Sequence, residues 1–160
     1  MNDYQAVMNL IGSYGQTVDE WPRQPERYAD HFTEDGSFSD NGVEVGPRSK
    51  ILALMKSAAG RTETQPLLAG TRHYQLNPII HLEGDRGHGS VDLMVVELSP
   101  EAGWRIRGCG RYKDEYAKDP DGAWRFRSRI LTWFKDAGPD PRNPALAEAY
   151  RDRFLAFMTG

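Results

Sequence analysis

Histidine is the side chain best suited to proton transfer near neutral pH, and four histidines occur in this sequence. His73 opens a long extended segment directly after a loop, where its ring can project into the space that the helices and the sheet enclose. There it could take or give a proton, but the position equally suits a histidine hydrogen-bonded at the rim of a pocket. His31, expected on an exposed helix turn, and His81 and His88 are interpreted as solvated or structural.

Two residues of the first helix are candidates for the same chemistry. Asp19 lies at the end of that helix, where its charge meets the negative end of the helix dipole unless a group such as a buried histidine compensates it. An exposed Asp19 without a chemical role is the alternative. Tyr14 belongs to the apolar stripe of the helix, so its ring should face inward and its hydroxyl needs a partner. It could equally be a plain core residue.

The spacing of the histidines argues against a metal site, because neither His-x-His nor His-x-x-x-His occurs. The lone cysteine, Cys109, allows no intrachain disulfide and leaves too few thiolates for structural zinc. We therefore expect no metal and no cofactor, and a reducing compartment.

Composition places the chain among ordinary globular proteins and argues against some partners. Its 160 residues fit a single domain over residues 1–160, and 39% of them are hydrophobic. The formal net charge of -3 argues against nucleic acid and anionic membranes as partners. No apolar run is long enough to cross a bilayer, and the N-terminus lacks the positive charge of a signal peptide. We expect a cytoplasmic location.

Five arginines on two neighbouring extended segments alternate with large apolar residues. The alternation predicts that the guanidinium groups share one face of the sheet and the apolar side chains the other. Because the net charge is negative, we interpret the arginine face as a polar surface paired with acidic neighbours or with a second subunit. The arginines are Arg105, Arg107, Arg125, Arg127 and Arg129, and the apolar residues are Trp104, Ile106, Trp124 and Phe126.

Three helices are predicted in the first part of the chain, from apolar residues spaced three and four apart. The first spans residues 3–18 and begins with a capping box. A short second helix carries Tyr28 and Phe32. The third helix has Gly60 in the position of a C-terminal cap.

Four long extended segments follow the helices, with glycine or proline in the turns between them. Helices followed by such a meander predict an α+β fold in which the helices close one side of a strongly curved antiparallel sheet. The concave side would hold a cavity. A last helix over about residues 143–158 needs an apolar partner, either the mouth of this pocket or a second subunit. The extended segments are residues 72–82, 87–98, 104–118 and 123–134.

Several short motifs, taken in their order along residues 3–134, together resemble one known family. Ile11-x-x-Tyr14-x-x-x-x-Asp19 is followed by His31-Phe32-Thr33-Glu34-Asp35-Gly36-Ser37-Phe38, by Gly46 and by Arg72-His73-x-x-x-Asn77. Gly110-x-Tyr112-x-Asp114-x-Tyr116 and Asp121-Gly122-Ala123-Trp124-Arg125-Phe126-x-x-Arg129 complete the series. In this order and spacing the chain resembles the SnoaL-like branch of the nuclear transport factor 2-like superfamily.

The resemblance implies a cone of curved antiparallel sheet and three helices around a hydrophobic pocket. Similar members, among them scytalone dehydratase, bile-acid dehydratase and lindane dehydrochlorinase, use an aspartate–histidine pair to remove a proton and expel a leaving group. Asp19 and His73 match that pair, and Tyr14 matches the position of another polar pocket residue. The implied activity is that of a cofactor-independent, dehydratase-like lyase. Its substrate would be small, hydrophobic, hydroxylated and cyclic, such as a steroid, a polyketide or an aromatic-pathway intermediate.

In this interpretation Asp19 holds one imidazole nitrogen of His73, while the other nitrogen abstracts the proton. Tyr14 donates a hydrogen bond to a carbonyl or to the departing hydroxyl. Related proteins associate through the outer face of the sheet, so we expect a homodimer or homotrimer. The side chains expected to line the substrate are Phe32, Phe38, Leu54, Met55 and Tyr112.

The chain departs from the family pattern at two places. No histidine occupies an inward position in residues 89–94, where scytalone dehydratase has a second one. Lys118 stands where relatives tend to show arginine, and we expect it to be exposed. An isomerase or cyclase of the same fold, a ligand-binding protein and the small subunit of a ring-hydroxylating dioxygenase are the alternative functions.

Overall fold

The computed structural model describes residues 2–20, 24–62 and 70–134. In these residues the helices lie in the first part of the chain, and the strands form one sheet. The α+β class predicted from the sequence is confirmed, and the predicted helix over residues 143–158 lies outside the described residues. The helices are α1 (Asp3–Asp19), α2 (Pro25–Ala29) and α3 (Arg48–Thr62). The strands are β1 (Phe32–Asp40), β2 (Val43–Val45), β3 (Thr71–Glu83), β4 (Arg86–Ser99), β5 (Gly103–Lys118) and β6 (Trp124–Trp133).

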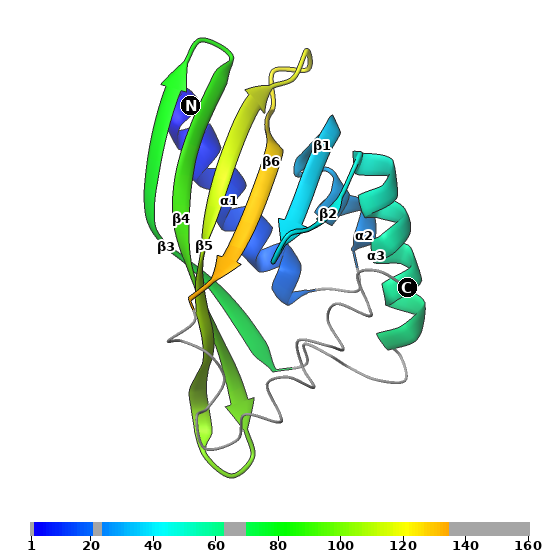
Figure 1. The fold of residues 1–160 in the computed structure, drawn as a ribbon, viewed down its shortest axis with the longest axis vertical. Helices are drawn as coiled ribbons and strands as arrows, with labels where there is room; N and C mark the ends of the chain where they lie inside the picture. The colour runs from blue at the N-terminus through cyan, green and yellow to red at the C-terminus, as the bar shows by residue number, and fades with distance from the viewer. Residues whose placement is uncertain (1, 21–23, 63–69, 135–160) are drawn as a thin grey trace.

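In the described part of the chain the strands form one curved, open sheet with the order β2-β1-β6-β5-β4-β3 (Figure 1). Strands β3 to β6 form the predicted antiparallel meander. The sheet is not wholly antiparallel, however, because β1 runs parallel to β6. Helix α1 packs on β3 and β6, while α3 packs on β1 and α2. The helices therefore cover one face of the sheet and leave the other face uncovered by any described helix.

Helix α1 forms where its pattern predicts it. Its capping box is present, since the Asn2 side chain accepts from the backbone N–H of Gln5 and the Gln5 side chain accepts from that of Asn2. The apolar stripe is buried against the sheet, with Val7 wholly inaccessible and Ile11 nearly so. Apolar burial on one face thus fixes which way Tyr14 and Asp19 can point.

Two predicted helix boundaries are wrong. Helix α2 ends at Ala29, and Phe32 begins β1 instead of continuing the helix. Phe32 pairs with Phe126 of β6, so tertiary pairing overrides the local helical spacing. Gly60 is not a cap, because α3 continues to Thr62. A glycine inside a helix costs only about 1 kcal/mol and can be outweighed by packing.

A β-bulge between β5 and β6 reverses the alternation of side chains. Glu115 pairs with Ser128, whereas the next residue, Tyr116, pairs with Phe126, so Arg127 is an extra residue. The residues after the bulge therefore exchange faces relative to a regular strand. As a result Arg129 points into the interior, which corrects the prediction that all five arginines share the outer face.

Among the described residues, no helix is both long enough and apolar enough to span a membrane.

Substitution of two glycines by alanine should change the free energy of unfolding in opposite directions, because one glycine is closely packed and the other is exposed. A Cβ atom added at Gly89 would overlap the carbonyl oxygen of Ile79 on the neighbouring strand, so Gly89→Ala must push β3 and β4 apart. We expect this change to lower the free energy of unfolding by about 2 kcal/mol. Gly12, exposed on α1 with nothing within 4 Å of an added Cβ, is the matched control. Gly12→Ala should raise the free energy by about 0.5–1 kcal/mol.

Urea unfolding followed by circular dichroism measures both changes. Similar effects of the two variants, in size and sign, would contradict the close approach of the strands at Gly89.

Candidate active site

Asp19 and His73 meet where the end of α1 lies against the start of β3. Oδ1 of Asp19 accepts a hydrogen bond from the backbone N–H of His73 at 2.9 Å, and it lies 2.9 Å from Nδ1 of the ring. Both side chains are mostly buried, with 16% of Asp19 and 10% of His73 exposed. The structure thus brings together two residues that the sequence analysis proposed as a pair.

This geometry determines the tautomer of His73. A carboxylate oxygen only accepts hydrogen bonds, so Nδ1 of the imidazole carries the hydrogen that is donated to Asp19. In the neutral ring Nε2 then has the free lone pair and is the nitrogen that can take a proton. The negative charge of Asp19 stabilises the imidazolium that results. The pair is therefore arranged as a base with an orienting carboxylate.

Arg129 lies wholly inside the molecule on the inner face of β6. Its guanidinium carbon is 4.2 Å from the ring centres of Tyr14 and Phe126 and 3.8 Å from that of Tyr112. Nη2 donates a hydrogen bond of 2.9 Å to Oε1 of Gln75. Aromatic faces and an amide oxygen thus replace part of the water that the charge would have outside.

Asp114 is the counter-ion of Arg129. Nε of Arg129 lies 3.4 Å from Oδ1 of Asp114, and neither side chain is exposed. The pair attracts as an ion pair, but its geometry is too poor for a hydrogen bond between these atoms. Oδ2 of Asp114 accepts from the Tyr116 hydroxyl at 3.1 Å. Burial raises the pKa of Asp114, and the charge of Arg129 opposes that rise.

Three buried nitrogen atoms in this interior have no hydrogen-bond partner among the described residues. They are Nε and Nη1 of Arg129 and Nε2 of Gln75. Buried donors are nearly always partnered, so these groups are suited to hold an oxygen of a ligand or water. Gln75 lies two residues after His73 on the same face of β3, and Arg129 is hydrogen-bonded to Gln75, so these donors face the same interior as His73. The interior thus combines a base with donors for an oxygen.

Tyr14 lies in the same interior but not at the Asp19–His73 pair. It is 1% exposed, and its hydroxyl shares a hydrogen bond of 2.8 Å with the hydroxyl of Tyr28. Burial raises the pKa of Tyr14 well above its usual value, so the phenol stays neutral. Any part it plays is therefore that of a hydrogen-bonding group.

The residues predicted to line the substrate come from three elements around this interior. Four of them are buried and belong to one apolar cluster, and Leu54 of α3 is half-buried and packs against it. Tyr112 lies under the guanidinium of Arg129, and Phe38 is the register partner of Arg129 on β1. Their contact with a substrate stays a prediction. The four buried residues are Phe32, Phe38, Met55 and Tyr112.

His31 is buried, contrary to the expectation of an exposed helix turn. Only 6% of the residue is exposed, because β1 begins directly after it and draws it under α1. Its Nε2 lies 2.8 Å from Oγ of Ser13, and its Nδ1 lies 3.2 Å from the carbonyl oxygen of Tyr28. Desolvation lowers the pKa of His31. Its contacts agree with a structural role, while His81 and His88 are exposed and stack on each other.

The other four arginines of the row have acidic partners, as predicted. They do not all share the outer face, because a bulge at Arg107 leaves Arg105 opposite Glu97, on the side of the buried Val95. Trp104 and Ile106 are therefore on the exposed face, contrary to the predicted alternation. Lys118, expected to be exposed, is partly so, with 30% of its side chain accessible, and it pairs with Asp3 at 2.9 Å. Arg105 and Arg107 pair with Glu97, Arg125 with Asp119 and Asp121, and Arg127 with Glu115 and Asp35.

Asp40, at the end of β1, is a buried acid that the sequence analysis did not single out. It is 1% exposed, and its Oδ1 accepts a hydrogen bond of 3.0 Å from Nε1 of Trp133. Its Oδ2 has no partner in the described parts of the chain. Desolvation raises the pKa of Asp40 to about 6, and the hydrogen bond from Trp133 opposes this rise.

Two of the interior polar residues missed by the sequence analysis carried a usable signal. Strand alternation places Gln75 on the face of His73, and it places Asp114 between two tyrosines that face inward. Arg129 carried no such signal, because the bulge that turns it inward follows from pairing between strands.

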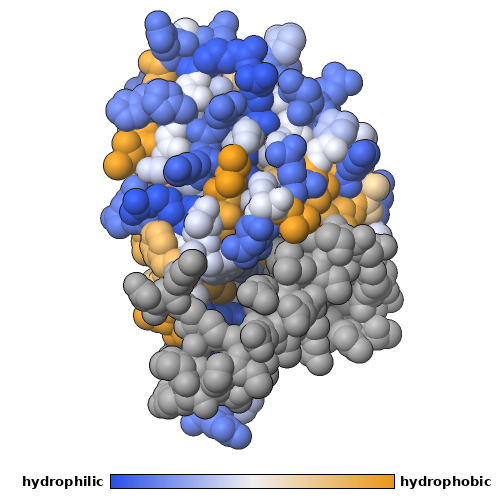
Figure 2. All heavy atoms as spheres, in the orientation of Figure 1, coloured by the Kyte–Doolittle hydropathy of each residue, from blue (hydrophilic) through white to orange (hydrophobic). Residues whose placement is uncertain are grey.

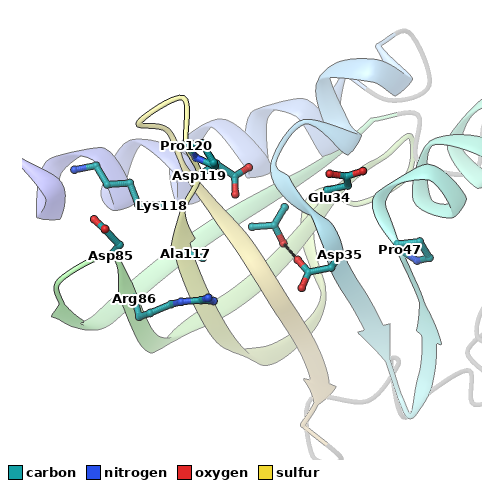
Figure 3. A pocket seen from close by; sticks show the side chains of 10 residues that line it. Glu34, Asp35, Pro47, Asp85, Arg86, Ala117, Lys118, Asp119 and Pro120 are labelled. Atoms are coloured by element: carbon teal, nitrogen blue, oxygen red, sulfur yellow. Dashed lines mark hydrogen bonds between the residues drawn. The ribbon is translucent and has the colours of Figure 1, made fainter.

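An open groove of about 840 Å³ lies at the other end of the sheet, near the turn between β3 and β4 (Figure 3). Glu34, Asp35, Asp85, Arg86 and Asp119 are among its lining residues. Its wall is largely charged and includes none of the predicted site residues, so it does not suit an apolar substrate. No group of three metal-ligating side chains occurs in the part of the chain that the structure describes.

Comparisons with solved structures agree with this architecture. An NTF2-like protein with a cystatin-like fold from Novosphingobium aromaticivorans matches with a TM-score of 0.71 and 21% identity, over 92% of this chain and 88% of that one. A protein of the same organism provisionally assigned as a scytalone dehydratase matches with a TM-score of 0.66 and 21% identity, over 82% and 84% of the two chains. The beta subunit of a provisionally assigned aromatic-ring-hydroxylating dioxygenase, also from N. aromaticivorans, matches with a TM-score of 0.65 and 18% identity, over 81% and 87%.

At these identities the likenesses show a shared fold, which is the NTF2-like one. No curated protein matches the chain significantly. The model of the SnoaL-like domain family, in contrast, matches residues 1–130, which is most of the sequence. The chain therefore belongs to the SnoaL-like family of the NTF2-like superfamily.

Proposed function

We propose that the protein is a cofactor-independent lyase that eliminates water, or a related leaving group, from a small hydrophobic cyclic substrate. The observation that carries this proposal is the double contact of Asp19 with the backbone and ring of His73, which leaves Nε2 as the proton acceptor. The SnoaL-like family membership and the structural likeness to a provisionally assigned scytalone dehydratase support the same reaction class.

In the proposed reaction Nε2 of His73 removes a proton from the carbon next to a carbonyl group. Asp19 stabilises the imidazolium by its charge and keeps the ring oriented. The negative charge that develops on the carbonyl oxygen needs donors that are already in place. We assign this role to the unpartnered nitrogen atoms of Arg129 and Gln75, because they are buried, Gln75 shares the face of His73 on β3, and Arg129 is hydrogen-bonded to Gln75.

Two other functions remain the alternatives. An isomerase would use the same base and donors but return the proton to the substrate. A non-catalytic protein or dioxygenase subunit would need no such pair. Partial burial of an aspartate and a histidine lowers the stability of the fold, because both lose hydration, and a protein without catalytic activity gains nothing from it. That cost favours the enzyme.

A panel of hydroxylated steroid-like and polyketide-like cyclic ketones tests the proposal. Wild-type protein should convert at least one of them with loss of water, measured by mass spectrometry. His73→Ala should abolish the loss, and Asp19→Asn should reduce kcat by about 10²-fold or more, since the orienting carboxylate is removed. Asp92→Asn, on the outer face of β4, is the matched control and should keep full activity.

Each other outcome has a definite meaning. A changed ultraviolet spectrum at unchanged mass would replace the lyase by an isomerase. Tight binding of a panel member without turnover would indicate a ligand-binding protein. Water loss that survives in His73→Ala would contradict the assignment of the base.

Arg129→Lys separates charge from geometry at the oxygen site. Lysine keeps the positive charge but lacks the planar set of donors, so we expect kcat to fall by about 10²–10³-fold with a smaller change in KM. Steady-state kinetics measures this split, and circular dichroism checks the fold. Equal loss in kcat and in ligand affinity would mean that Arg129 only supports ground-state binding.

We also propose that the chain forms a homodimer or homotrimer through the outer face of the sheet. Several large apolar side chains are exposed there among polar ones, and Figure 2 shows apolar and hydrophilic residues interspersed over one side of the molecule. Leu98 is the register partner of Trp104, and Ile106 follows two residues along β5, so these three exposed side chains adjoin one another. A contiguous exposed apolar patch marks a contact site. The exposed apolar residues of β3 to β6 are Tyr74, Leu76, Ile79, Leu98, Trp104, Ile106 and Ile130.

A charge introduced at the most exposed of these residues tests the interface. Ile106 is 64% exposed, and Ile106→Glu should shift the molecular mass measured by light scattering from the oligomer to the monomer. Tyr4→Glu, at a half-exposed position on α1 away from the sheet face, should leave the mass unchanged. A monomeric wild type would exclude the proposal.

A further inference from the structure

We propose that Asp40 is a second proton-transfer group of this interior and that its carboxyl group protonates the oxygen that leaves the substrate. The inference rests on the proposed elimination and deepens it, because it names the class of leaving group for which the site is built. A hydroxide ion is a poor leaving group and departs readily only when it is protonated. The Asp19–His73 pair supplies a base but no acid for that step.

The first support is the direction of the Asp40 side chain. In the parallel pairing of β1 with β6, Phe38 lies opposite Arg129 and Asp40 lies opposite Leu131. Side chains of opposed residues point to the same face of a sheet. Arg129 and Leu131 are both buried on the inner face, so Asp40 also points into the interior.

The second support is that one row of inward positions connects the two groups. The row starts at Trp133 of β6, whose Nε1 donates a hydrogen bond to Oδ1 of Asp40. It continues through the register partners Gly110 on β5 and Leu93 on β4 and ends at Gln75 on β3. Gln75 is on the face of His73, two residues further along β3. Gly110 contributes no side chain to the row, and Cδ1 of Leu131, the register partner of Asp40, lies only 3.1 Å from where a Cβ of Gly110 would be.

The third support is that contacts across the interior connect the same residues. Arg129 is hydrogen-bonded to Gln75 and lies over Tyr112. Burial raises the pKa of Tyr112 and of Tyr28, and an ionised Asp40 adds to the rise. Arg129 therefore occupies the space between Gln75 and Tyr112. Its register partner Phe38 lies two residues before Asp40, so the guanidinium joins the His73 side of the interior to the Asp40 side.

The chemical state of Asp40 suits a proton donor. Oδ2 is buried without a partner in the described residues, so it can carry a proton toward a ligand. Burial raises the pKa of this carboxyl group to about 6, which keeps it protonated far more readily than an exposed aspartate. The groups around it are Trp133 of β6, Tyr28 of α2 and Tyr112 of β5, while Glu44 of β2 is exposed beside the neighbouring Ser39.

The proposed step balances without a further reactant. Nε2 of His73 takes the proton of the C–H bond, and the electron pair of that bond forms the new C=C bond. The C–O bond breaks as the carboxyl proton of Asp40 moves to the leaving oxygen, and water departs. The imidazolium then returns its proton to the carboxylate of Asp40 through water, which restores both groups. The net change is the loss of one water molecule from the substrate.

The test compares two leaving groups on the ring that the ketone panel identifies as a substrate. One compound carries the β-hydroxyl group, and the other carries a para-nitrophenyl ether at the same carbon. The nitrophenolate ion departs without a proton, so only the hydroxyl compound needs the acid. Asp40→Asn has nearly the same shape and keeps an acceptor for Trp133. We expect its kcat for water loss to fall by about 10²-fold or more, and at least tenfold further than its kcat for release of nitrophenolate.

The same pair of compounds gives a pH readout on the wild type that does not depend on how the variant folds. Asp40 must be protonated to act, so water loss should decrease as the pH rises through about 6, whereas release of nitrophenolate should show no such decrease. Trp133→Phe removes the hydrogen bond that lowers the pKa of Asp40, and it should move this decrease to higher pH.

The outcomes separate this inference from the proposed function. If His73→Ala abolishes both reactions while Asp40→Asn slows both equally or neither, the elimination stands and the acid role of Asp40 is overturned. If wild type releases neither water nor nitrophenolate from any panel ring, the proposed function fails and the inference fails with it. Identical pH profiles for the two leaving groups would also overturn the role of Asp40.

Discussion

The burial of the Arg129 guanidinium is the constraint around which the interior is arranged. A charge removed from water is costly unless partners replace its hydration. Here three aromatic faces, the amide of Gln75 and the carboxylate of Asp114 surround the guanidinium. The replacement is incomplete, because Nε and Nη1 have no hydrogen-bond partner among the described residues. A core selected for stability alone would be expected to fill such a position with an apolar side chain.

Other buried polar groups of the interior also lack part of their hydrogen bonds with the described residues. Gln75 and Asp40 each have one buried polar atom without a partner in the described residues, and Asp114 has another. Unsatisfied buried groups of this kind destabilise a fold and therefore call for a reason. A ligand with polar atoms supplies one, since it would complete the hydrogen bonds that the protein leaves open. The apolar cluster of β1, α3 and β5 around these atoms suits the hydrophobic body of that ligand.

The Asp19–His73 pair depends on this arrangement as much as on its own contacts. Helix α1 must lie across the concave side of the sheet for its last residue, Asp19, to reach His73 near the start of β3. The packing of Tyr14 against Phe126, Tyr112 and Arg129 holds the middle of that helix in place. Structural aromatic contacts and the candidate chemistry are therefore coupled, and Tyr14 contributes to both through its neighbours.

The sequence by itself determined the elements that local patterns control. Period-two and helical spacing, the capping box at Asn2 and the turn glycines predicted α1 and the four-strand meander, since these signals act between residues close in the chain. Resemblance to a family then selected Asp19 and His73, although strand and helix ends alone left both open to plain structural roles.

Only the tertiary structure decided that Arg129 and Asp40 lie inside. The bulge at Arg127 reverses the side-chain alternation of β6 and turns Arg129 inward. The parallel pairing of β1 with β6 makes Phe32 part of a strand and places Asp40 in the interior. Pairing between strands far apart in sequence sets register, and a shift of one residue exchanges the two faces. Burial and the electrostatics of the site follow from that register, which no local spacing in the chain encodes.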